Sequence, residues 1–185
     1  MKNSYQLTKV ALIFLCFLCI STCFNSDRHT VEDIRGMTEV YKVLEEKTLT
    51  VQADFDMEAW SEMLADDVSY SFPDSGANEQ TTLYGKPAVM DYWQNWRKKH
   101  SIKSMSFSGF THAPFISDQN LNVSGLSGVY VFSIFTSKMI FTNGETVEIF
   151  MNYCCHFNKD KRIDRCYTYY DRTPIIQALT RGSTH

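Results

Sequence analysis

The sequence predicts an α+β fold in which helices cover one face of an antiparallel sheet. Through the first hundred residues, apolar side chains recur at three- and four-residue steps, as in amphipathic helices. After His100 they alternate instead, and turn signals separate the apolar segments, as in hairpin-linked strands. Helices followed by a run of strands are typical of α+β domains, and a strongly curved sheet wrapped around one long N-terminal helix forms a cone.

Three helices are predicted ahead of the main sheet. The first begins near Thr30, a candidate N-cap, and ends near Thr48, where its apolar stripe breaks. The stripe of this helix consists of Val31, Ile34, Met37, Val40, Tyr41 and Leu44. The second helix carries Met57, Trp60 and Leu64 on one face, and the third begins near Gly85 and buries Val89, Tyr92, Trp93 and Trp96.

The first strand is predicted between the second and third helices, and it ends at the turn that begins with Pro73. Asn143-Gly144 is a hairpin signal, and a polar turn follows Phe157. The region between residues 120 and 128 is rich in Asn, Ser and Gly and predicts a loop. The predicted strands cover residues 68–72, 105–115, 129–135, 147–157 and 163–170.

The first residues predict export. Lys2 and Lys9 precede an apolar run over residues 10–19, which is shorter than the ~20 residues that span a bilayer. A basic start, a short apolar core and small residues after it are typical of a secretory signal. The run Ile20-Ser21-Thr22-Cys23 resembles the bacterial lipobox, which implies lipid attachment at Cys23. An ordinary signal peptide is the alternative.

These patterns divide the chain into a signal peptide (residues 1–23), a tether (24–30), one domain (31–175) and a tail (176–185). We expect a cell-envelope lipoprotein, or otherwise a periplasmic or secreted protein. Such a protein meets the membrane only through a lipid anchor.

Composition argues against several partners and cofactors. The formal net charge is -3 and no basic stripe is present, so nucleic acid is not expected as a partner. The short basic run 97–100 suits the end of a helix, where cations interact favourably with the helix dipole. Of the six cysteines, only Cys154, Cys155 and Cys166 belong to the folded part. No spacing resembles a zinc site, and neither a metal nor another cofactor is expected.

Three motifs resemble, in the correct order, those of the SnoaL-like proteins of the nuclear transport factor 2-like superfamily. They are the step from helix to first strand (residues 60–73), the glycine ahead of the third helix (85–93) and the last hairpin (157–163). The resemblance runs from about Val31 to Asp171 and implies the cystatin-like α+β cone of that superfamily. Its members include isomerases, dehydratases, epoxide hydrolases, polyketide cyclases and non-enzymatic binding domains, so the fold alone gives no reaction.

Comparison with the ketosteroid isomerases of this superfamily argues against that reaction. In those enzymes an aspartate base precedes the proline after the first strand, whereas Phe72 precedes Pro73 here and cannot take a proton. Asp74 is better explained as a turn residue that faces water. The second isomerase carboxyl corresponds to Tyr153, whose hydroxyl can donate to an oxyanion. A donor without a base does not complete an isomerase.

Strand alternation predicts the lining of a cavity inside the cone. With Tyr153 facing inward, Cys155 and Phe157 share its face, and across the hairpin the inward residues are Asp164, Cys166, Thr168 and Tyr170. The predicted ligand-binding residues are Tyr70, Phe72, Trp93, Trp96, Tyr130, Tyr153, Cys155, Thr168 and Tyr170, with Val129 as the alternative to Tyr130. The alternative for these aromatic side chains is a plain hydrophobic core.

The candidate catalytic residues are His112, Tyr153, Tyr70 and Asp164. His112 suits general acid–base catalysis because an imidazole titrates near neutral pH, although a single strand histidine also fits a packing role.

Three functions follow. The domain binds a small apolar or aromatic molecule, or it is a cofactor-independent lyase, isomerase or hydrolase using His112 with Tyr153 or Tyr70, or it is a structural domain that forms a homodimer through the outer sheet face. An all-aromatic cavity favours the first function, an acid–base pair inside the cone the second and a filled cone the third.

The three domain cysteines are predicted to remain thiols. Cys154 and Cys155 point to opposite faces of their strand. If the hairpin closes at Phe157 without a bulge, Tyr153 lies opposite Cys166 and Cys155 is its diagonal neighbour. Diagonal positions are ~7–8 Å apart, beyond the reach of a disulfide. A one-residue bulge would instead place Cys154 opposite Cys166 and allow a bridge.

Overall fold

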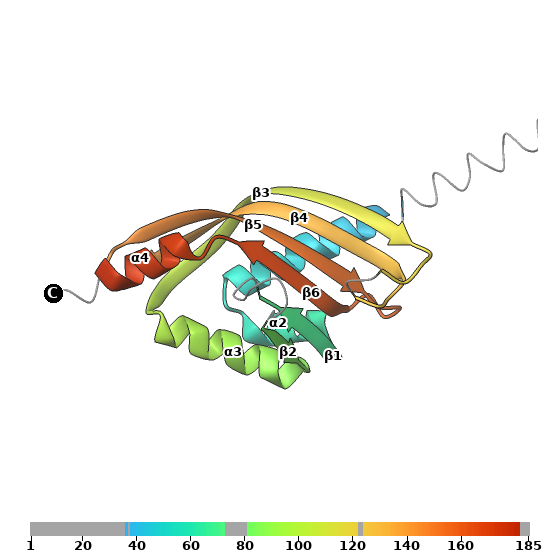
Figure 1. Ribbon diagram of the computed structural model, residues 1–185, viewed down its shortest axis with the longest axis horizontal. Coiled ribbons are helices and arrows are strands. Elements are labelled where there is room, and N and C mark those ends of the chain that lie inside the picture. Colours follow the sequence, from blue (N-terminus) through green and yellow to red (C-terminus); the bar gives the residue numbers. More distant parts are fainter. Residues whose placement is uncertain (1–35, 37, 73–80, 122–123, 182–185) are drawn as a thin grey trace, which may run out of the picture. The chain divides into compact units, whose positions relative to one another are not determined.

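A computed structural model of the chain describes residues 36, 38–72, 81–121 and 124–181 (Figure 1). Tyr41–His185 form one compact unit, to which the following description refers. The predicted signal peptide, Cys23, the tether and the turn at Pro73 lie outside the described residues. None of the helices within the described ranges is long and apolar enough to span a membrane.

The sheet has six strands in the order β2-β1-β6-β5-β4-β3, and it curves over the helices (Figure 1). The strands are β1 (Leu64–Ser71), β2 (Thr82–Tyr84), β3 (Ile102–Ser117), β4 (Gly128–Phe141), β5 (Thr146–Phe157) and β6 (Ile163–Tyr170). The predicted α+β class and the four long strands are confirmed. The short edge strand β2 was not predicted, and one pair corrects the all-antiparallel expectation, because β1 runs parallel to β6.

The helices comprise residues 38–53, α2 (Met57–Met63), α3 (Lys86–Lys99) and α4 (Thr173–Arg181). The first does not end at Thr48 but continues to residue 53, and the Thr48 hydroxyl donates to the carbonyl of Leu44 at 2.8 Å within the helix. Asp56 caps α2 by accepting from the backbone N–H of Ala59 at 3.1 Å. Helix α4 begins at the end of the predicted domain and continues through residues 176–181 of the predicted tail, and it packs beside β5.

The first helix matches its predicted stripe in part: Tyr41 is buried as predicted, whereas Val31, Ile34 and Met37 lie outside the described residues. Val40 is 42% exposed, and Leu44 is only half-buried. The side chains that are buried are Tyr41, Glu45, Thr48, Leu49, Gln52 and Ala53. Half of this buried face is polar, and apolar spacing therefore does not indicate Glu45, Thr48 and Gln52.

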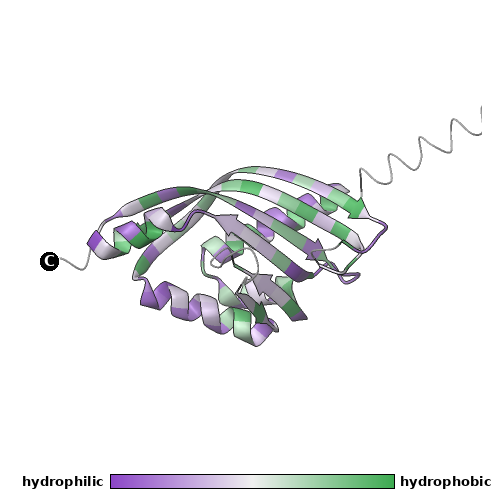
Figure 2. Cartoon of the chain, viewed as in Figure 1, coloured by the Kyte–Doolittle hydropathy of each residue, from purple (hydrophilic) through white to green (hydrophobic). Residues whose placement is uncertain are grey.

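Strand β5 faces as predicted, with Tyr153, Cys155 and Phe157 buried on the concave side of the sheet. Figure 2 shows the matching alternation of hydrophobic and hydrophilic residues along the long strands. This alternation places one continuous apolar face of the sheet against the helices.

The register between β5 and β6 differs from the prediction. The hairpin closes one residue later, with Phe157 opposite Ile163, and a bulge follows at Asp164. Together they shift the partners by two residues, which preserves the inward direction of Thr168. Asp164, however, is an extra residue on the opposite face, where its carboxylate lies 2.5 Å from Nδ1 of His156. The prediction that Asp164 faces the cavity is therefore wrong.

Tyr130 also lies on the convex side of the sheet, because it pairs with His156 in the neighbouring strand. Its ring stacks on Phe115, with 5.2 Å between centroids, and its hydroxyl donates to the carbonyl of Leu126 at 2.8 Å. Val129, the alternative, is therefore the residue of this pair that shares the inner face of β4. The assignment of Tyr130 to the cavity lining is wrong.

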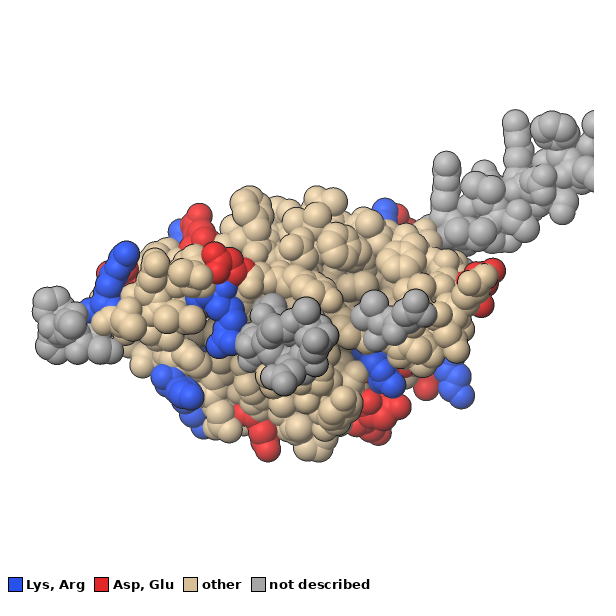
Figure 3. All heavy atoms as spheres, viewed as in Figure 1, with Lys and Arg blue, Asp and Glu red and all other residues tan. Residues whose placement is uncertain are grey.

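Charged side chains do not form a basic stripe on the face drawn in Figure 3, where acidic and basic groups are interspersed. Some of them are paired, since Lys86 lies 2.8 Å from Asp66 and Lys138 lies 3.2 Å from Glu148.

Candidate functional site

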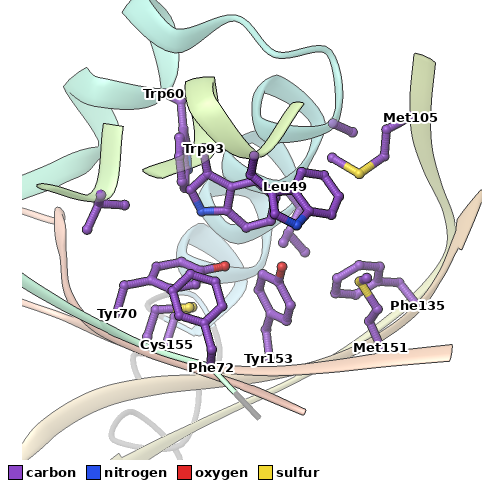
Figure 4. Packing of buried hydrophobic residues seen from close by; sticks show 14 of the residues in the cluster. Leu49, Trp60, Tyr70, Phe72, Trp93, Met105, Phe135, Met151, Tyr153 and Cys155 are labelled. Carbon is purple, nitrogen blue, oxygen red and sulfur yellow. The ribbon is translucent and has the colours of Figure 1, made fainter. Parts of the chain in front are cut away.

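The space between the concave face of the sheet and the helices is filled mainly by aromatic side chains (Figure 4). All three tryptophans of the chain lie here, and their rings meet edge to face. Tyr70 from β1 and Tyr153 from β5 are also in edge contact, with 6.3 Å between ring centroids and 85° between ring planes. Edge-to-face packing of this kind stabilises a core beyond simple burial of area.

Several polar atoms in this interior have no hydrogen-bond partner within the described ranges. The donors among them that face the aromatic rings are Nε1 of Trp60, Nε1 of Trp93 and the hydroxyl of Tyr153; the others are Oε2 of Glu45, Nε2 of His112 and Oγ of Ser137. Figure 4 shows the hydroxyls of Tyr70 and Tyr153 projecting from the sheet toward Trp93 and Leu49. A buried polar group without a partner costs about 1–3 kcal/mol, so each such group needs an explanation.

The tyrosine hydroxyls are permanent donors rather than bases. Burial raises the pKa of both Tyr70 and Tyr153 well above the usual value near 10. The Tyr70 hydroxyl accepts a hydrogen bond from Nε2 of Gln52 at 3.2 Å. At physiological pH both phenols stay neutral.

Glu45, on the first helix, is the acidic group of this interior. It has no exposed surface, its Oε1 accepts a hydrogen bond from Oγ of Ser133 at 3.4 Å, and its Oε2 has no partner among the described residues. Burial raises the pKa of Glu45 to about 7, and hydrogen bonds from Cys155 and Ser133 offset only part of the rise. A carboxyl that titrates near neutral pH can either give or take a proton.

His112 from β3 connects to this carboxyl through the same serine. Its Nδ1 lies 2.9 Å from Oγ of Ser133, and its Nε2 lies 3.6 Å from the carboxylate of Glu46. When the serine hydroxyl donates to Glu45, its oxygen can accept a hydrogen bond from the Nδ1–H of His112, so the three groups form one hydrogen-bonded chain. Burial lowers the pKa of His112, and the neighbouring Glu46 offsets part of this effect. Glu46 is 56% exposed, so His112 stands between the interior and a carboxylate at the surface, although Nε2 makes no hydrogen bond among the described residues.

Sequence reasoning identified His112 but missed Glu45 and Ser133. Glu45, Thr48 and Gln52 recur at helical steps on one face, and this polar stripe was the available signal. Ser133 carries no comparable signal, because only the pairing of β3 with β4 places it beside His112.

Little empty space remains in the interior. A cavity of about 10 Å³ is left, which is room for about one water molecule. Its walls are Glu45, Thr48, Leu49, Gln52, Trp60, Leu64, Tyr70, Tyr153, Cys155, Ile163 and Cys166. A wider groove of about 690 Å³ lies at the surface beside Phe55 and Arg97, and none of the predicted site residues lines it.

Most of the predicted ligand-binding residues are buried on the inner side, although burial alone does not assign them a ligand. They are Tyr70, Phe72, Trp93, Trp96, Tyr153, Cys155 and Thr168. Tyr170 is half-buried, whereas Tyr130 and Asp164 lie on the opposite, convex face of the sheet. The described residues include no cluster of three His, Cys, Asp or Glu side chains placed to hold a metal ion.

The chain resembles several solved structures in its fold. A provisionally assigned polyketide cyclase from Xanthomonas campestris pv. campestris has a TM-score of 0.58 at 15% identity, over 77% of this chain and 98% of that one. A nuclear transport factor 2-like protein from Anabaena variabilis has a TM-score of 0.55 at 13% identity, over 74% and 91%. This chain has the nuclear transport factor 2-like fold.

A third structure, an LEH-like epoxide hydrolase from Mycobacterium tuberculosis, has a TM-score of 0.53 at 17% identity, over 80% of this chain and 94% of that one. The sequence matches no protein-family model and no curated protein. At such identities the likeness shows the nuclear transport factor 2-like fold alone, so the chemistry depends on this chain's own interior.

Proposed function

We propose that this exported domain binds a small, largely aromatic molecule with a hydrogen-bond acceptor in the interior behind Tyr153. The observation that carries the proposal is the set of unpartnered donors that face one aromatic interior, the indoles of Trp60 and Trp93 and the hydroxyl of Tyr153. A ligand carbonyl or ether that accepts from any of them removes part of the cost of their burial. The aromatic walls supply the apolar contact that such a ligand needs.

A filled interior is the feature that favours the structural alternative. Binding here therefore requires side chains to move, because the cavity of about 10 Å³ does not hold an organic molecule. The protein must therefore populate a more open arrangement, to which the ligand binds preferentially. The expected result is an affinity lower than that of a preformed pocket, since part of the binding free energy is used for opening.

Tryptophan fluorescence tests the proposal directly, because every tryptophan of the chain lies in this interior. Acetophenone and ethylbenzene are matched probes of similar shape, and only the first has a carbonyl acceptor. We expect saturable quenching by acetophenone, and Tyr153→Phe should weaken its binding about 10-fold, as for the loss of one hydrogen bond. Tyr84→Phe, at a side chain that is 75% exposed, is the control. Equal binding of both probes, or linear quenching without saturation, would contradict the proposal.

A second candidate function, proton transfer on a bound carbonyl compound, is supported by Glu45 and its connection to His112. A general base works best when its pKa lies near the operating pH, and burial raises the pKa of Glu45 to about 7. In this scheme Glu45 takes a proton from carbon next to the carbonyl, while Tyr153 donates to the developing oxyanion. Ser133 and His112 then exchange that proton with solvent.

Deuterium exchange into the methyl group of acetophenone, followed by NMR, measures this activity without knowledge of the natural substrate. The exchange rate should fall at least 10-fold in Glu45→Gln, as for the loss of a general base. Glu62→Gln, an exposed residue of α2, should retain the rate. If acetophenone binds but wild-type protein gives no exchange above buffer, the domain is a binding domain only.

A further inference from the structure

Cys155 and Cys166 lie directly opposite each other in strands β5 and β6. The later turn and the bulge at Asp164 produce this pairing, which replaces the predicted diagonal arrangement. Both side chains point to the concave side and are almost fully buried, at 1% and 3% exposure. Their sulfur atoms are 3.0 Å apart, closer than two thiols in ordinary contact and about one ångström longer than the ~2.05 Å of a disulfide bond.

Cys154 cannot take part in this pair. It lies on the convex side of β5, opposite Tyr167 of β6 and Phe132 of β4, because neighbouring strand residues alternate in direction. All three cysteines are thiols in the structure. The domain therefore contains one matched pair and one cysteine without a partner across the sheet.

We propose that Cys155 and Cys166 are the site of an intramolecular disulfide that forms when the chain folds in the presence of a small-molecule or protein disulfide. One cysteine thiolate attacks the oxidant's disulfide and releases one thiol, and the second thiolate then displaces the other. Two protein thiols and one oxidant disulfide become one protein disulfide and two oxidant thiols, so atoms and electrons balance. This inference is independent of the proposed ligand.

Burial determines when the exchange can take place. It raises the pKa of Cys155 and Cys166, so few thiolates are present once the protein is folded. Exchange should therefore occur during folding, while the β5–β6 hairpin is still accessible. The same burial should protect the finished disulfide from reductants in solution, so dithiothreitol should reduce it rapidly in urea and slowly without it.

Tryptic mapping of the full chain tests the proposal, since the cleavage sites separate the two cysteines. Lys159 follows Cys155 and Arg165 precedes Cys166, so the peptides are 139–159 and 166–172. After refolding with glutathione disulfide and blocking of free thiols, we expect these peptides to be joined, with a mass two hydrogen atoms below their sum. Two separate peptides with every cysteine blocked would overturn the proposal.

Three serine variants establish which sulfur atoms are involved. Cys154→Ser should retain the linked peptides in full, whereas Cys155→Ser and Cys166→Ser should each lose them. A cross-link in Cys155→Ser would mean that Cys154 can reach Cys166, which also contradicts the proposed pairing. Because Cys154→Ser leaves both inner sulfur atoms in place, it tests the pair even if the other two variants fail to fold.

Discussion

Glu45 is the buried ionisable residue whose protonation should affect the stability of the fold most. A carboxyl without exposed surface is uncommon unless it is paired, and this one has hydrogen bonds only from Ser133 and Cys155 and, among the described residues, no partner for its second oxygen. It is therefore held in the folded state mainly as the neutral acid at low pH. As pH rises and the carboxyl ionises, burying Glu45 costs more free energy. This makes the unfolding free energy depend on pH.

We expect unfolding free energy to fall as pH rises from about 4.5 to about 7. The pKa of Glu45 is raised from 4.5 to about 7 in the folded state, so the folded protein binds the proton more tightly than the unfolded chain does. Stability from this proton is fully present below pH 4.5 and is lost by pH 7, a change of about 3 kcal/mol.

Glu45→Gln should remove most of the pH dependence of the unfolding free energy, and Glu62→Gln, at an exposed site, should not. Urea denaturation at several pH values measures both. An unchanged slope in Glu45→Gln would show that other groups cause the pH dependence.

Gly128 is the glycine whose backbone and surroundings both exclude a side chain. Its φ is 131°, and an added Cβ would lie 2.8 Å from Nε2 of His156. That nitrogen already lies 3.1 Å from the carbonyl of Ser127, so the ring has little freedom to move. Gly128→Ala should therefore lower the unfolding free energy by about 2–4 kcal/mol.

Gly109→Ala separates the cost of a strained backbone conformation from the cost of a steric clash at the added Cβ. Gly109 also has a positive φ, 68°, but nothing lies within 4 Å of an added Cβ. It should lose only about 1 kcal/mol in the same denaturation measurement. Equal losses in the two variants would mean that backbone conformation alone accounts for both.

At the scale of helices and strands, the sequence predicted what depends on local pattern. The limits of β6, the Asn143-Gly144 turn and the buried face of α3 all follow from alternation, turn chemistry or helical spacing. The bulge at Asp164 could not be predicted, because the sequence of a strand does not show whether a polar residue occupies a paired position or is the extra residue of a bulge. One inserted residue decides which cysteines meet and removes Asp164 from the interior.

The candidate site was predicted in part for a related reason. Tyr70 and Tyr153 were found because aromatic alternation is visible along a single strand. The contact of Glu45 with Ser133 joins residues from the first helix and the fourth strand. These residues are 88 positions apart, so no local sequence pattern predicts the contact. Helical periodicity would have placed Glu45 inside only if polar residues had been allowed on the buried face.

Helix α2 offers a direct test of local structure. With only seven residues it depends on its cap, Asp56, whose side chain accepts from the N–H of Ala59. Asp56→Ala should cost about 1 kcal/mol of unfolding free energy, measured by urea denaturation. Asp54→Ala is the matched control, since Asp54 is exposed and does not cap the helix. If both variants lose the same amount, loss of negative charge rather than of the cap is responsible.

At the scale of the whole molecule, the predicted export of the chain remains a prediction that the described residues do not address. We expect the mature protein from a bacterial host to begin at Cys23 with a diacylglycerol adduct, because residues 20–23 resemble a lipobox. Mass spectrometry of the N-terminus measures this. Cys23→Ser should abolish the adduct, whereas Cys19→Ser should retain it. An unmodified start further along the chain indicates a secreted protein, and an intact Met1 contradicts export.

The convex face of the sheet carries exposed apolar side chains that could form a contact between two copies of the domain. Ile134, Phe150 and Tyr169 are 40%, 75% and 41% exposed and lie on this face in three neighbouring strands. Exposed aromatic and aliphatic side chains gathered in one place are typical of a protein interface. We expect a homodimer through this face, with Phe150 near its centre.

Phe150→Lys should shift the protein to monomer, because a charge placed in an apolar interface loses its water without gaining a partner. Sedimentation velocity across a range of concentrations measures the change, which should exceed 10-fold in the dissociation constant. Tyr84→Lys is the control, since Tyr84 is equally exposed, at 75%, but lies on edge strand β2. A wild-type protein that stays monomeric at high concentration would exclude this interface. A dimer weakened by Tyr84→Lys instead would place the contact at the sheet edge, where unpaired backbone groups can join two sheets.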